Sequence, residues 1–315
     1  MSVGYIGSHG YHELLSLDTN LPVPTICPAS PCPTGYPAGA YYFPANARLA
    51  NNSVWNTTDW FSEGVSSYNG LEVDINHRIT RGLQFRGAYT FAKALDDGDN
   101  MNTSVATNSP AFVANPLQPT ADYGRASFDV RHSAVINATY DLPFGRSILR
   151  KRAWLNRLTE DWQLSGIETI QSGLPFTPQL SYNPSNDGDT RNPVRPSWNP
   201  AFSGPLILGL PGKYFNPSSF VQPLPGTYGN VGRNVLQGPG LAELDLSLAK
   251  RFALSERFNL QFRAESFNLL NRTNINAPNP VVFTAATGGP SPTAGVITNT
   301  STTSRQLQFG LKLLW

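Results

Sequence analysis

Two histidines near the start of the chain have side chains that could bind a metal ion. His9 and His12 lie close together in Gly7-Ser-His-Gly-Tyr-His12, and imidazole is a common ligand of zinc and other transition metals. Two histidines alone leave the ligand set incomplete. We therefore expect no metal site here, and we expect both residues where the first strand enters its loop.

The carboxylates of Asp96-Asp-Gly-Asp99 resemble a fragment of a calcium-binding loop. An EF-hand loop also needs a glutamate at its twelfth position, and none stands there. The segment is therefore expected to be a solvated loop tip.

Cys27 and Cys32, in Cys-Pro-Ala-Ser-Pro-Cys, are the only two cysteines of the chain. Their short spacing in a polar, proline-rich stretch predicts a local disulfide in an exported loop, with two free thiols as the alternative. Metal binding is disfavoured because no histidine or second cysteine pair lies nearby.

A basic cluster occupies residues 143–157 without any acidic residue, and consists of Arg146, Arg150, Lys151, Arg152 and Arg157. It could contact lipid phosphates at a membrane rim or form an ordinary solvated face. The glycine-rich stretch 226–240 lacks the Lys-Ser/Thr of a phosphate-binding loop. We expect no enzyme, no catalytic residue and no cofactor.

These groups are carried by segments in which apolar and polar residues alternate, the pattern of strands with two different faces. One segment sets Leu71, Val73 and Ile75 against Glu72, Asp74 and Asn76. Similar alternation marks residues 83–91, 128–140, 162–176, 244–248 and 258–265, and residues 2–7 are expected to be the stub of an earlier strand. With the last strand this makes about eight strands. We also expect Asp245 and Arg263 to pair diagonally across their hairpin.

The final strand has the clearest pattern and ends at the terminal aromatic residue. One face carries Leu307, Phe309, Leu311, Leu313 and Trp315. The other carries Gln306, Gln308 and Lys312. Such an ending resembles the closing strand of a bacterial outer-membrane β-barrel, which serves as the signal for the barrel assembly machinery.

Short and long connections alternate strictly along the chain. Residues 80–82, 143–160 and 253–257 are short or moderate links, whereas 8–61, 96–126, 178–240 and 271–303 are long and rich in proline, glycine and small polar residues. Compact soluble domains rarely hold several such loops. Outer-membrane barrels do, with short periplasmic turns and long extracellular loops. The alternation predicts an all-β, antiparallel transmembrane barrel whose C-terminus lies on the short-turn side.

Composition agrees with this prediction. Only 14% of residues are charged and the net charge is +2, which gives no reason to expect nucleic acid as a partner. The chain has no run of about 18 apolar residues that could form a transmembrane helix. The apolar strand faces avoid Arg and Lys in their central stretches, as contact with outer-membrane lipid requires.

Several segments together resemble the C-terminal part of TonB-dependent outer-membrane receptors of the Oar-like kind, which carry a carboxypeptidase-regulatory-like domain. The resemblance runs over nearly the whole chain and depends on the order of loose motifs. These are Tyr5-Ile-Gly-Ser-His-Gly10, Tyr68-Asn-Gly-Leu-Glu72, Tyr89-Thr-Phe-Ala-Lys-Ala94, Tyr214-Phe-Asn-Pro-Ser-Ser-Phe220, Gly226-Thr-Tyr-Gly-Asn-Val-Gly-Arg-Asn234, Gly238-Pro-Gly240, Leu244-Asp-Leu-Ser-Leu-Ala-Lys-Arg-Phe252 and Arg263-Ala-Glu-Ser-Phe-Asn-Leu-Leu-Asn-Arg-Thr-Asn274.

The resemblance implies a 22-stranded barrel with an internal plug, and uptake energised by the TonB complex. Residues 1–315 would be the C-terminal part of that barrel, with signal peptide, plug, TonB-contacting segment and N-terminal strands absent. The ligand stays unknown: a ferric siderophore, a vitamin or an oligosaccharide would suit a polar lumen. Two alternatives remain: a small outer-membrane barrel acting as an adhesin or structural protein, and a secreted soluble β-sandwich that binds a partner.

Overall fold

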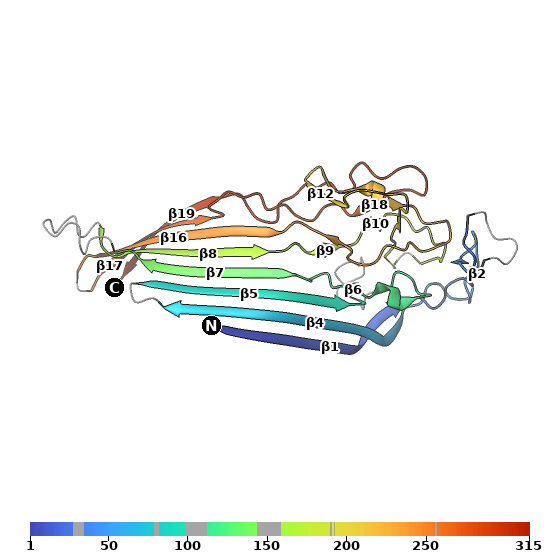
Figure 1. Cartoon of the computed structure of the whole chain (residues 1–315), viewed down its shortest axis with the longest axis horizontal. Helices are drawn as coiled ribbons and strands as arrows, with labels where there is room; N and C mark the ends of the chain where they lie inside the picture. The colour runs from blue at the N-terminus through green and yellow to red at the C-terminus, as the bar shows by residue number, and fades with distance from the viewer. Residues whose placement is uncertain are drawn as a thin grey trace.

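Long antiparallel strands form one extended sheet, and their long connections gather at one end of it (Figure 1). The computed structural model describes residues 1–27, 35–78, 82–98, 112–143, 159–189, 191, 193–255 and 257–315. The sheet strands pair in the order β1-β4-β5-β7-β8-β16-β17-β19, with β6 paired to β5. Their bounds are Ser2–Leu17 (β1), Asp59–Arg78 (β4), Leu83–Asp96 (β5), Gly124–Arg125 (β6), His132–Asp141 (β7), Trp162–Gln171 (β8), Leu241–Ala253 (β16), Asn259–Phe267 (β17) and Gln306–Leu314 (β19).

The strand register joins the apolar residues of neighbouring strands into one continuous face. Leu71 stands opposite Tyr5 on one side and Phe91 on the other, and directly opposed residues share a face of the sheet. Glu72 of the other face lies opposite Gly4 and Thr90. The predicted two-faced character of the strands is therefore present across the sheet.

One acidic residue departs from this separation. Glu168 lies opposite Ile136 and Leu244, which belong to the apolar face. It stands in β8 only a few residues from Gln171, where the strand reaches the long-connection end.

The first and last strands of the sheet each keep one open edge. Within the residues that the structure describes, β1 forms a ladder only with β4 and β19 only with β17, and the sheet does not close. Each edge therefore presents backbone N–H and C=O groups without a ladder partner.

Several strand limits differ from the sequence-based expectation. The first strand is no stub, because β1 pairs with β4 from Ser2 opposite Asp74 to Leu17 opposite Asp59. Glycines and polar residues hide this length in the pattern, whereas the pairing continues through a register shift beside His12. The strand expected to reach position 176 ends at Gln171, and β9 (Pro175–Phe176) pairs instead with β15 (Leu236–Gln237).

The long connections are not simple loops, because they fold together into a layer. We call the described parts of residues 18–58, 97–131, 172–240 and 268–305 the loop layer. It holds a buried apolar core, consisting of Phe176, Leu180, Tyr214, Phe215, Phe220, Val231, Leu236, Val282, Phe283 and Ala294. Besides β6, β9 and β15, its short elements are β2 (Thr25–Ile26), β3 (Tyr41–Tyr42), η2 (Pro119–Asp122), β10 (Gln179–Leu180), β11 (Ser197–Trp198), β12 (Ile207–Leu210), β13 (Lys213–Phe215), η3 (Pro217–Ser219), β14 (Phe220–Val221) and β18 (Val281–Phe283).

Contacts between connections join the loop layer into one body. We number the four connections of the loop layer in chain order. The Phe43 N–H of the first connection donates to the Gly226 carbonyl of the third at 2.8 Å. Gly226 has a left-handed φ of 76°, and a Cβ there would collide with Phe43. Only glycine allows this close approach.

Candidate functional site: a hollow in the loop layer

The two histidines lie within β1 rather than at its entry into a loop. His12 adopts a left-handed φ of 59° at the bulge of β1. Its Nδ1 lies 3.0 Å from the Ser62 carbonyl oxygen, so local pairing uses the ring. Within the described ranges, no three His, Cys, Asp or Glu side chains gather so that they could hold a metal ion.

The aspartates at the end of β5 are buried, so the expectation of a solvated loop tip is wrong. Asp96 is 5% exposed and pairs with Arg233, while Asp97 is 6% exposed. Asp97 accepts the Val65 N–H at 3.0 Å. Both carboxylates are used to anchor the loop layer onto the sheet, and Asp99 lies outside the described residues.

The disulfide, the basic cluster and the terminal apolar stripe stay predictions. Cys27 is buried, with its N–H donating to Ala40, but Cys32 lies outside the described residues. All five residues of the basic cluster, Arg146, Arg150, Lys151, Arg152 and Arg157, also lie outside the described residues. In β19, Leu311 and Leu313 stand opposite Phe262 and Leu260 on the apolar face. An assembly role for this stripe, with Leu307, Phe309 and Trp315, stays a prediction.

A hollow in the loop layer is the best candidate for a ligand site. One part, of about 360 Å³, lies between the second and third connections. A second part, of about 590 Å³, lies beside the first connection. Both are lined by Asn115, Gln118, Thr227 and Tyr228, so they adjoin. We call the two parts together the loop hollow; its size falls in the range of small-molecule sites.

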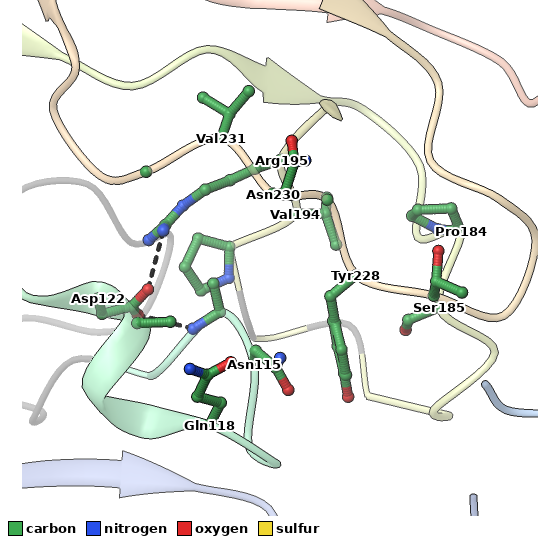
Figure 2. Close-up of a pocket in the computed structure, with 16 residues that line it drawn as sticks. Asn115, Gln118, Asp122, Pro184, Ser185, Val194, Arg195, Tyr228, Asn230 and Val231 are labelled. Carbon is green, nitrogen blue, oxygen red and sulfur yellow. Dashed lines mark hydrogen bonds and ion pairs between the residues drawn. The ribbon is translucent and has the colours of Figure 1, made fainter. Parts of the chain in front are cut away.

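The ionised side chains that line the loop hollow neutralise each other. Arg195 Nη1 lies 2.8 Å from Asp122 Oδ1. Figure 2 marks this ion pair with a dashed line. Burial lowers the pKa of Arg195, and the Asp122 carboxylate opposes that shift. The pair therefore adds no net charge to the wall.

The back wall at Tyr228 is held by a hydrogen bond to an aspartate. The Tyr228 hydroxyl donates to Asp187 Oδ2 at 2.7 Å. Burial raises the pKa of Tyr228, and the neighbouring Asp187 carboxylate adds to the rise. The phenol is therefore protonated at neutral pH, and its ring is fixed against the hollow beside Phe43, whose ring it meets edge-on at 6.0 Å.

Some polar groups of the wall have hydrogen-bonding capacity to spare. Asn115 accepts the Leu117 N–H through Oδ1, and Asn230 accepts the Trp198 N–H through Oδ1. Their amide N–H₂ groups and the whole amide of Gln118 have no partner among the described residues. A bound molecule could satisfy these groups.

A model of a protein family, described as outer membrane beta barrel domain, matches residues 1–308. The chain belongs to the outer membrane beta barrel domain family. No curated protein matches it significantly. Membership places this barrel domain in the outer membrane of a Gram-negative-type bacterium. No helix in the described part of the domain has the length and apolar character to cross a membrane.

Sequence reasoning did not find the hollow of this barrel domain. Asn115, Gln118, Arg195 and Tyr228 come from distant connections, and no local spacing brings them together. The nearest signal was the glycine-rich stretch 226–240, which contributed only to the family resemblance. Its Gly229 approaches the Arg195 carbonyl so closely that a Cβ would collide there.

Proposed function

We propose that this domain is a sector of a TonB-dependent transporter barrel of the Oar-like kind, which takes up a ligand across the outer membrane. The observation that carries the proposal is the folded loop layer with its hollow at one end of the sheet. A ligand held there would stand above the strands at the entrance to a barrel. Displacement of a plug would then open the lumen to it.

The open edges support a larger barrel. In hydrocarbon, each unsatisfied backbone group costs several kcal/mol, so an open sheet does not span a bilayer alone. Both β1 and β19 therefore need strand partners in the membrane. We propose that further strands of the same barrel supply them, and that the plug and TonB contacts come from the N-terminal part of the transporter.

Growth of the source bacterium tests the proposal. A strain lacking the gene is compared with its parent and with a tonB deletion strain on ferric citrate, cobalamin and neutral oligosaccharides as required nutrients. We expect at least one nutrient to fail in both deletion strains. The proposal of energised uptake is wrong if every nutrient supports all strains equally. It is also wrong if growth on a nutrient requires this gene but not tonB. Loss of surface attachment without any nutrient defect would instead favour an adhesin.

A further inference from the structure

We propose that the loop hollow binds a neutral oligosaccharide. This names the ligand class of the site in the proposed function and rests on that function for its biological role, though not for binding itself. The residues that line the hollow, and its division into two parts, support this ligand class.

Charge comes first. Asp122 and Arg195 are the ionised residues among those that line the hollow, and their side chains are paired at 2.8 Å. An anionic ligand such as a carboxylate-rich iron chelate needs cationic donors that are not already neutralised. A cationic ligand would need a spare carboxylate. The wall therefore favours a ligand without net charge.

The wall also has groups that can form hydrogen bonds with a ligand. The wall offers the amide N–H₂ groups of Asn115 and Asn230 and both ends of the Gln118 amide. Amides can donate and accept at once, and sugar hydroxyls do the same.

Flat apolar side chains line the hollow as well. Tyr36, Tyr41 and Tyr228 line the hollow together with Pro37 and Pro184. A tyrosine presents an apolar ring with a polar tip. The C–H face of a sugar ring packs on such a surface while its hydroxyls meet the amides. Figure 2 shows Asn115, Gln118 and Tyr228 around the same hollow.

The two adjoining parts distinguish a chain of sugars from a single one. The parts, of about 360 and 590 Å³, share four lining residues; Arg195 lines the first and Tyr41 the second. A linear neutral oligosaccharide can occupy both parts, whereas a monosaccharide would leave one of them empty. We therefore expect affinity to rise with chain length.

Binding to outer-membrane vesicles tests the proposal with the protein in its own membrane. The probes are fluorescent maltohexaose, cellohexaose, xylohexaose and mannohexaose, with their monosaccharides and hexagalacturonate as comparisons. Vesicles from the parent strain should bind at least one neutral hexasaccharide more than tenfold more tightly than its monosaccharide. Vesicles from the gene-deletion strain should not. If no neutral hexasaccharide shows gene-dependent binding, or if hexagalacturonate binds best, the proposal is wrong.

Variants locate the binding. Asn115→Asp keeps the Oδ1 that accepts the Leu117 N–H but removes the spare amide donors. Gln118→Glu likewise removes the amide donors of Gln118, whose side chain is exposed. Each should weaken hexasaccharide binding at least tenfold. Asn52→Ala, exposed in the same loop layer but outside the hollow, should leave binding unchanged. The heat-modifiable band on gels confirms equal insertion, and full binding by an inserted Gln118→Glu variant would overturn the assignment.

Binding and uptake can fail separately. Vesicle binding needs no TonB complex, so gene-dependent binding with tonB-independent growth would overturn the proposed transport and leave the oligosaccharide site standing. Energised uptake of ferric citrate without hexasaccharide binding would do the opposite.

Discussion

The guanidinium of Arg233 bonds to the carboxylate of Asp96, although the two residues stand 137 positions apart in the chain. Their side chains are only 6% and 7% exposed. Arg233 Nε also donates to the Asp122 carbonyl at 3.0 Å. One arginine of the third connection thus holds the end of β5 and the second connection, and Asp122 in turn binds Arg195 in the loop hollow.

Replacement of Arg233 by alanine should loosen the loop layer. Removing one partner of a buried ion pair leaves the other charge uncompensated and costs about 3–5 kcal/mol. Hydrogen exchange of the amides near Leu236 should show a loss of local stability of that order.

The matched control is Arg86→Ala. Arg86 and Asp74 form an ion pair of 3.1 Å on the sheet, with side chains 64% and 36% exposed. An exposed pair contributes about 0–1 kcal/mol, so this variant should change exchange in the loop layer little. Equal effects of the two variants would show that Arg233 does not anchor the layer.

The two faces of the sheet should respond differently to an added charge. Leu246 stands opposite Gly166 on the apolar face, whereas Ser247 stands opposite Glu265 on the polar face. In an intact barrel, Leu246→Arg should destabilise by about 2–4 kcal/mol, and Ser247→Arg should cost far less. Urea titrations in lipid vesicles measure both, and similar losses would remove the assignment of faces.

Much of the sheet could be predicted because strand faces are a local property. The alternation around Leu71 and Leu246 requires only the chain's own period of two, and the structure places both residues on the apolar face. Register is less local. Arg263 lies opposite Ala249 and beside Glu265 at 3.5 Å, not near Asp245. Asp245 accepts the Asn268 N–H instead, so the predicted diagonal pair is wrong.

The loop layer could not be predicted because its contacts join residues that are far apart in the chain. Asp96 looks like part of a polar turn when only its neighbours are considered, and its burial depends on Arg233. Likewise, Asn115 and Tyr228 meet at the hollow only after three connections have packed together. Such long-range contacts leave no periodic pattern in the sequence.

The cysteines offer a prediction outside the sheet. Cys27 lies in the first connection, which we place on the cell exterior, where thiols become oxidised. Non-reduced peptides from the mature protein should contain Cys27 linked to Cys32 in mass spectra. Alkylation of both residues without a reducing agent would contradict the pairing.

The apolar stripe of β19 should promote assembly. Deletion of Trp315, which is 88% exposed at the end of the stripe, should lower the amount of heat-modifiable barrel in outer-membrane fractions. Deletion of the same residue should leave synthesis unchanged, as measured in whole-cell blots. Undiminished insertion would show that the terminal aromatic residue is not part of the assembly signal.

Labelling of engineered cysteines on intact cells tests most directly whether the loop layer faces outward. Trp55→Cys lies in the loop layer at a position 86% exposed, and Ser255→Cys lies in the exposed turn between β16 and β17. Both are made in a background with Cys27→Ser and Cys32→Ser. A membrane-impermeant maleimide should label position 55 on intact cells, and position 255 only after the outer membrane is opened. Labelling of position 255 but not 55 on intact cells would contradict the account.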